Sequence, residues 1–191
     1  MKPKRIKRLH KNILNDSVRD YNIKSNSISL LVDGMANSGG FESKNLWDGV
    51  KIIRTMTRDK DCTKFLSFVG SIISTGARGI IKDMLKRKMF DCVITTCGAL
   101  DHDIARTSTK YYSGDFRMDD NLLYKKNIHR LGNVLVHQNN YGPVIEKKVQ
   151  DCLNELYQKG LQSVSTFEIT KKIGSTLDET SFLYWAYKND I

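Results

Sequence analysis

The sequence predicts an α/β fold, a Rossmann-like parallel sheet with flanking helices, and two observations lead to this prediction. A short apolar segment, a loop containing glycine and an amphipathic helix follow one another twice between residues 64 and 106. Parallel strands produce this alternation, because a helix must return the chain to the start of the sheet before the next strand. The last predicted helix is followed by no strand, so we expect the sheet to be incomplete at the C-terminus.

Six cationic residues precede the first acidic one, so we expect residues 1–24 to form a basic arm and residues 25–191 to form one domain.

Two helices are expected ahead of the sheet. Residues 28–35 carry apolar side chains at helical spacing, and the glycine pair that follows is typical of a helix end. The same spacing recurs over residues 46–56.

The alternating segment gives the elements of the predicted sheet. In order, we expect a strand, a loop, a helix, a second strand and a second helix over residues 64–69, 70–76, 77–88, 91–97 and 99–106. The inward side of the first of these helices is predicted to consist of Ile80, Ile81, Met84 and Leu85.

Four further elements are expected downstream. They are a third strand over residues 131–136, a long helix over 141–157 and two shorter helices over 166–173 and 180–188. The long helix is predicted to bury Ile145, Val149, Cys152, Leu153 and Leu156.

Composition narrows the classes of function. No run approaches the ~18 apolar residues of a membrane span, and no secretory signal is evident, so we expect a cytoplasmic protein with no membrane partner. The net charge of +10 fits either a lysine-rich surface or an acidic partner, but no nucleic-acid-binding motif accompanies it. The four cysteines lack the spacing of a metal site or redox motif, so we predict no metal.

The first candidate binding loop spans residues 70–76 and follows the first predicted strand. Its glycines allow the backbone to approach a phosphate, and its hydroxyls and the amides of the following helix are possible donors. The loop lacks the GxGxxG pattern of dinucleotide-binding proteins, so an ordinary strand-to-helix turn explains it equally well.

The second candidate loop spans residues 95–103 and follows the second predicted strand. Asp101, His102 and Asp103 bring two carboxylates and an imidazole to the first turn of the next helix. Helix capping by Asp101 or Asp103 is the alternative interpretation. Ligands bind at the carboxyl ends of parallel strands, so two such loops at neighbouring strand ends favour a binding site.

Three segments resemble deoxyhypusine synthases. Residues 70–107, with the run TTCGALDHD, resemble the nucleotide-binding segment of the family, and the archaeal type most closely. Residues 131–141 resemble its RIGNLLVPNENY segment, and SFLYWAYKNDI at the C-terminus resembles its SVYYWAQKNHI. The resemblance extends from about residue 31 to residue 191, which identifies residues 25–191 as the N-terminal portion of a deoxyhypusine-synthase-like NAD-binding domain.

The resemblance implies an activity. This family uses NAD to transfer the aminobutyl group of spermidine to a lysine of the translation initiation factor 5A precursor. The positions that match its cofactor-binding residues are Gly70, Ser71, Ile72, Ile73, Ser74, Thr96, Cys97, Gly98 and His102. The positions that match its spermidine-binding acidic pair are Asp101 and His102.

The sequence departs from the family at two points. His102 stands where the family has an acid, and a neutral histidine does not attract a polyamine, so Asp103 is a candidate to compensate. No lysine here matches the family's nucleophile, so no catalytic residue is assigned to this chain. We therefore expect a split subunit that joins a C-terminal deoxyhypusine synthase chain in a tetramer-like hetero-oligomer. The alternative is a non-catalytic regulatory paralogue that activates a complete chain.

Overall fold

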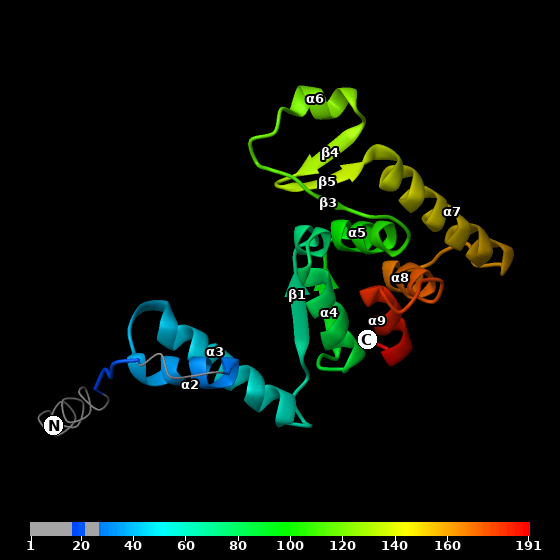
Figure 1. Cartoon of the computed structure of the whole chain (residues 1–191). Coiled ribbons are helices and arrows are strands. Elements are labelled where there is room, and N and C mark those ends of the chain that lie inside the picture. The colour runs from blue at the N-terminus through cyan, green and yellow to red at the C-terminus, as the bar shows by residue number, and fades with distance from the viewer. Residues whose placement is uncertain (1–16, 22–26) are drawn as a thin grey trace, which may run out of the picture. The chain divides into compact units, whose positions relative to one another are not determined.

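The computed structural model describes residues 17–21 and 27–191, which form two compact units that meet in sequence at Cys62 (Figure 1). The first unit is a helical hairpin of α2 (Ile28–Ser38) and α3 (Phe41–Arg58). Both predicted helices are confirmed and are longer than the pattern indicated. Gly39 and Gly40 join them with φ angles of 40° and 120°, a backbone that glycine adopts at little steric cost. Most of the predicted basic arm lies outside the described residues.

The second unit, residues 63–191, contains the predicted α/β alternation. Strand β1 (Phe65–Phe68) leads through a 3₁₀ turn, η1 (Gly70–Ser74), into α4 (Ala77–Lys86). Strand β2 (Cys92–Thr95) follows and leads directly into α5 (Cys97–Ser108). The two strands are parallel, and the Thr95 hydroxyl donates to the Phe68 carbonyl at 2.7 Å where they end.

Three local predictions were wrong. The predicted strand over residues 91–97 ends at Thr95, so Cys97 begins a helix instead of ending a strand. Ile80 was predicted to face inward but is 59% exposed, and Leu153 on the long helix is 39% exposed. In both helices the buried stripe is narrower than the apolar pattern, because only one side of each helix meets the core.

The predicted third strand is also wrong, because residues 131–136 contain a reversal. Gly132 has a φ of 61° and turns the chain between β4 (Ile128–Leu131) and β5 (Val134–His137), which pair antiparallel. A short strand, β3 (Tyr112–Ser113), pairs with the other edge of β5. These three strands form a sheet that is separate from β1 and β2 in the described residues. Helix α6 (Asp120–Lys125) packs against β4.

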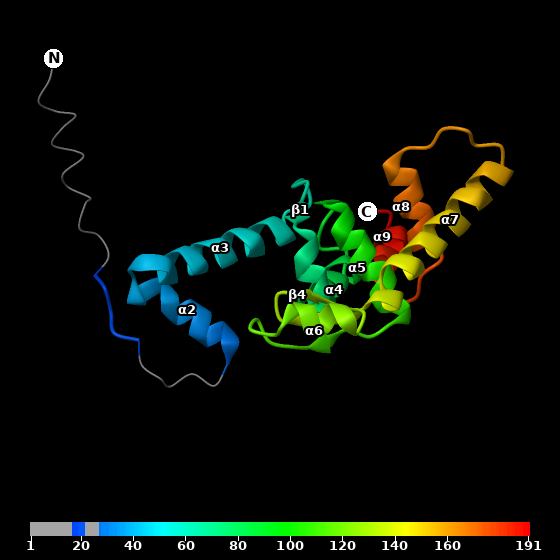
Figure 2. The ribbon, with the colours of Figure 1, turned by 90° about the horizontal axis from the view of Figure 1, so that it is seen from above.

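The remaining helices complete one core. After the 3₁₀ turn η2 (Gln138–Asn140), α7 (Gly142–Gln158), α8 (Thr166–Gly174) and α9 (Phe182–Asn189) pack in succession, and α7 and α9 also contact α5 (Figure 2). Helix α9 also packs along α4. Together they cover one face of the β1–β2 pair with a continuous apolar cluster that includes Ile73, Ile81, Leu85, Ile104, Cys152, Ile173 and Phe182. No helix among the described residues has both the length and the apolar character needed to cross a membrane.

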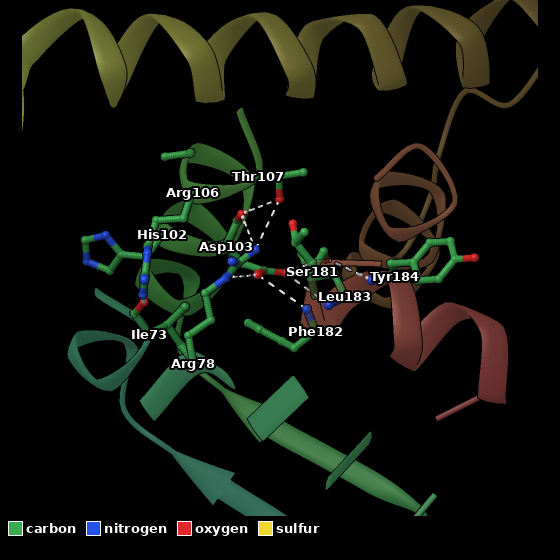
Figure 3. A network of polar contacts seen from close by, with 12 residues as sticks. Ile73, Arg78, His102, Asp103, Arg106, Thr107, Ser181, Phe182, Leu183 and Tyr184 are labelled. Carbon is green, nitrogen blue, oxygen red and sulfur yellow. Dashed lines mark hydrogen bonds and ion pairs between the residues drawn. The ribbon is translucent and has the colours of Figure 1, made fainter. Parts of the chain in front are cut away.

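A fully buried carboxylate joins three of these helices (Figure 3). Asp103 on α5 accepts hydrogen bonds from Arg78 Nε on α4 at 2.7 Å and from Ser181 Oγ at 2.6 Å. It also accepts from the backbone amides of Phe182 at 3.3 Å and Leu183 at 3.0 Å, at the start of α9. A buried charge is tolerated when it is paired and its lone pairs are hydrogen-bonded, and Asp103 meets both conditions.

We expect Asp103→Ala to lower the free energy of unfolding by about 3–5 kcal/mol, because it leaves the Arg78 guanidinium buried and the α9 amides without their acceptor. Asp83→Ala is the matched control, since Asp83 on α4 is exposed and its ion pair with Lys82 contributes at most about 1 kcal/mol. Urea denaturation of both variants measures the difference. Equal losses would contradict the role assigned to Asp103.

Candidate functional site

The two candidate loops lie in direct contact at the carboxyl ends of β1 and β2. The amide of Gly70 donates to Thr96 Oγ1 at 3.0 Å. A Cβ atom at Gly70 would lie 2.7 Å from the carbonyl carbon of Gly98 and 2.7 Å from the amide nitrogen of Ala99. Glycine at position 70 is therefore required by the approach of one loop to the other, independently of any ligand.

The first loop presents only part of itself at the surface. Ile73 is fully buried and Ser74 is 4% exposed, with its hydroxyl donating to the Ser71 carbonyl at 2.7 Å. Ser71 is exposed and Ile72 is half-buried. Of the five positions predicted in this loop, Ser71 thus offers its side chain to a ligand, whereas Ile72 packs against the core cluster and Ile73 and Ser74 anchor the loop.

An arginine that sequence reasoning missed fixes this loop from the neighbouring helix. Arg106 on α5 donates through one guanidinium nitrogen to the carbonyls of Ile73 at 2.6 Å and Thr75 at 2.5 Å. The same guanidinium lies 5.6 Å from the centre of the Tyr111 ring. Arg106 follows the quoted LDHD motif by three positions, but nothing in its local sequence indicates a contact with a loop 31 residues earlier.

The second loop ends in the N-terminus of α5, whose backbone amides are able to bind an anion or a polar group. Thr96 is the N-cap residue, yet no side chain caps the helix. Thr96 and Cys97 are exposed, and a Cβ atom at Gly98 would have no neighbour nearer than 3.9 Å. Uncapped amides beside an open glycine are able to hold a phosphate or a carboxamide, so these residues fit a dinucleotide.

Asp101 lies one turn further along α5 and contacts a tyrosine. Burial raises the pKa of its half-buried carboxyl, and a hydrogen bond from the Tyr141 hydroxyl partly opposes this. The pKa of Tyr141 is raised in turn by burial and by the nearby carboxylate, so the phenol stays protonated as the donor. Tyr141 precedes α7, and sequence reasoning gave it no role in the site.

His102 points to different neighbours. Its Nδ1 atom and the Tyr111 hydroxyl are hydrogen-bonded at 2.9 Å, and its ring lies 5.3 Å from that of Tyr141. The residue as a whole is 9% exposed. Burial, followed by repulsion from Arg106, lowers the pKa of His102, so the imidazole is neutral at pH 7.

Asp103 does not join this site. We expected it to compensate for the missing acid at position 102, but its carboxylate is fully buried and bonded to Arg78, Ser181 and the start of α9. The predicted capping role is closer to the outcome, although Asp103 caps α9 and not its own helix. No cluster of three potential metal ligands occurs in the described part of the chain.

Comparisons with known proteins agree on one family. A family model of deoxyhypusine synthase matches residues 30–191. The "Probable deoxyhypusine synthase" of Picrophilus torridus is 47% identical over 181 residues, which are 94% of this chain and 58% of that protein. The protein of the same name from Thermoplasma volcanium is 46% identical over 183 residues, again covering 58% of its length. The chain thus spans little more than half the length of these relatives.

A solved structure supports the fold alone. The crystal structure described as a "putative deoxyhypusine synthase from Entamoeba histolytica" superposes with a TM-score of 0.60 at 20% sequence identity. The match covers 91% of this chain and 60% of that chain.

We expect the stability of the folded chain to depend on pH through His102. Its pKa in the folded state lies below the ordinary 6.5, so its contribution is present above pH ~6.5 and is lost as the pH falls and the buried ring must charge. His102→Asn, which keeps a hydrogen-bonding group near the position of Nδ1, should therefore lose less stability than the wild type between pH ~7.5 and ~5. Chemical denaturation at each pH measures this, with the exposed His129→Asn as the control. Parallel curves for wild type and His102→Asn would refute the prediction.

Proposed function

Because the chain belongs to the deoxyhypusine synthase family, we propose that it supplies the cofactor-binding part of a deoxyhypusine synthase. The reaction is the NAD-dependent transfer of the aminobutyl group of spermidine to a lysine of the translation initiation factor 5A precursor. The nucleophilic lysine and the remaining ligands come from a C-terminal deoxyhypusine synthase segment, with which this chain forms an oligomer.

The observation that carries this proposal is the contact between the two loops at the carboxyl ends of adjacent parallel strands. In open parallel sheets this edge is where dinucleotides bind. The amides that begin α5, beside Gly98, hold a polar or anionic part of NAD, and Ser71 borders it from the first loop. NAD itself supplies the acceptor for the hydride that leaves the amine.

Asp101 is the carboxylate that this chain offers to the cationic amine. Its half-buried position raises its pKa, and a bound ammonium group would oppose this shift by favouring the ionised carboxylate, with which it forms a charge-assisted hydrogen bond. Tyr141 orients the carboxylate, and His102 packs beside it as a neutral ring held by Tyr111. The net charge of +10 repels a polyamine at a distance, but it favours approach of an acidic protein substrate.

One observation favours a second candidate function, that of a regulatory paralogue which activates a complete chain. His102 is neutral, and the Asp103 carboxylate is buried in the core. This turn of α5 therefore presents one accessible carboxylate where the family has an acidic pair. A chain with this defect still offers the surfaces through which a partner is stabilised. Activity of a complex in which the partner lacks its own cofactor loops separates the two functions.

We expect Gly98→Val to lower spermidine-dependent NADH formation at least tenfold, about 1.4 kcal/mol, in a complex of this chain with the C-terminal part of the Picrophilus torridus relative. The new side chain projects into the open space where the cofactor binds, and its Cβ atom has Gly70 Cα, at 3.9 Å, as its nearest neighbour. Gly79→Val on α4 is the control, since a Cβ atom there has no neighbour within 4 Å. Absorbance of NADH is the measurement. Equal rates for the two variants would place the cofactor elsewhere.

We expect Asp101→Asn to raise the KM for spermidine about tenfold and to leave the Kd for NAD unchanged, because a charge-assisted hydrogen bond is worth about 1.5–3 kcal/mol. Asp83→Asn, on the exposed side of α4, is the control. Steady-state kinetics at several spermidine concentrations give the KM, and fluorescence titration gives the Kd. A rise in the Kd for NAD with an unchanged KM would reverse the assignment of Asp101.

A further inference from the structure

The half-buried Arg106 guanidinium is held by uncharged partners. It donates to the carbonyls of Ile73 and Thr75 in the first loop. In the part of the chain that the structure describes, no carboxylate forms an ion pair with it, and Asp103, whose charge attracts it, is paired with Arg78. A hydrogen bond from a charged donor is about twice as strong as a neutral one. Arg106 thus directs its charge-assisted hydrogen bonds to the backbone of the first loop (Figure 3).

Tyr111 links this guanidinium to His102. The Arg106 guanidinium lies over the Tyr111 ring, 5.6 Å from its centre. The hydroxyl of the same tyrosine is hydrogen-bonded to His102 Nδ1 at 2.9 Å, and the two rings meet edge to face with their centres 5.7 Å apart. A tyrosine that is held at its hydroxyl keeps its ring in place against Arg106. His102 therefore supports the contact between Arg106 and the first loop.

The charge at position 102 decides whether this arrangement holds. Positions 102 and 106 are one helical turn apart on α5, the spacing at which an aspartate and an arginine form an ion pair. An acidic residue at position 102 would present a carboxylate to the guanidinium, and a carboxylate accepts a stronger hydrogen bond than a backbone carbonyl does. The Arg106 side chain would then turn away from the carbonyls of the first loop. A neutral imidazole does not compete for the guanidinium, and His102 is neutral at pH 7.

Two explanations of this histidine lead to opposite expectations. If His102 is an amine ligand that has lost its charge, a carboxylate at this position should improve spermidine binding. If His102 serves the first loop through Arg106, a carboxylate should loosen that loop and weaken cofactor binding. The structure favours the second explanation, because His102 is 9% exposed and its Nδ1 atom is already bonded to Tyr111.

We propose that His102 is a positioning residue: through Tyr111 it keeps Arg106 on the two carbonyls that fix the first cofactor loop. This inference rests on the proposed function for the identity of the ligand that the loop binds. The departure from the family's acidic pair is then a change in how the loop is held, and it does not by itself mark a chain that has lost its activity.

Hydrogen–deuterium exchange of the backbone amides in the free chain tests the positioning role without any ligand. We expect His102→Asp to speed exchange of residues 70–76 at least tenfold and His102→Asn to leave it close to the wild type. Both new side chains can accept a hydrogen bond from Tyr111, and only the first is charged. His129→Asp, at an exposed position on β4, controls for the added charge. In the Arg106→Gln background, which itself speeds exchange, His102→Asp should add nothing, because the two residues act as one unit.

Two results of this measurement overturn the proposal. One is equal exchange of the loop in His102→Asp and His102→Asn. The other is faster exchange in His102→Asp throughout the second unit with no excess in the loop, because the residue is then merely structural. Tyr111→Phe decides the matter where His102→Asp does not fold, since it removes the hydroxyl that His102 holds. It should speed exchange of the loop severalfold, whereas Tyr112→Phe, at a position that is 56% exposed, should not. Equal loop exchange in these two variants also overturns the proposal.

A complex with the C-terminal part of the Picrophilus torridus relative provides the second measurement. We expect His102→Asp to raise the Kd for NAD at least tenfold and to leave the KM for spermidine at saturating NAD unchanged. In the Arg106→Gln background the same substitution should not change the Kd, whereas direct repulsion of the cofactor would still raise it. A fall in the KM for spermidine with an unchanged Kd for NAD overturns the proposal, since position 102 then faces the amine.

The positioning role and the proposed function fail separately. A wild-type complex that binds no NAD contradicts the function, and exchange of the loop in the free chain still reports on His102. A complex that forms NADH equally well with His102→Asp and with the wild type, and whose Kd for NAD is the same, contradicts the positioning role and leaves the function in place.

Discussion

The Asp103 carboxylate is the interaction on which the second unit depends. It lies at zero exposure and gathers a guanidinium from α4, a hydroxyl from Ser181 and the first amides of α9 (Figure 3). Residues 78 and 103 sit on the helices that follow the two parallel strands, so this one group sets the distance between those helices. The α9 amides join from about 80 residues further along the chain. A buried charge with this many partners is costly to leave half satisfied, which makes the arrangement nearly all-or-none.

The geometry of the candidate site follows from that constraint. With α4 and α5 fixed, the loops that precede them are brought together, and Gly70 allows backbone contact with the start of α5. Arg106 then ties the carbonyls of the first loop to the second helix. Three consecutive residues of α5 contact different neighbours, because successive helical positions point about 100° apart. Asp101 faces Tyr141, His102 faces Tyr111, and Asp103 faces the core.

The sequence was sufficient where the controlling physics was local. Apolar patterns located both parallel strands and every described helix except α6, and the rule for strand ends correctly brought the two loops together. Prediction from the sequence failed where contacts with distant residues determine the local structure or the role of a side chain. The turn at Gly132 divides an apolar run into a hairpin, and only its positive φ reveals this. Asp103 looked like a site residue because its partners at 78 and 181 are far away in sequence. The roles of Tyr111 and Tyr141 have the same origin, since each reaches α5 from another element.

The topology of the parallel sheet determines how much of the proposed crevice the described residues form. A crevice at the carboxyl edge of a parallel sheet needs loops from both sides of the point where the strand order reverses. In the described residues the β1–β2 sheet has a single crossover, through α4, so both candidate loops leave strands that advance in the same direction. The proposed cofactor crevice therefore needs loops from the other side of that point, which the described residues do not supply.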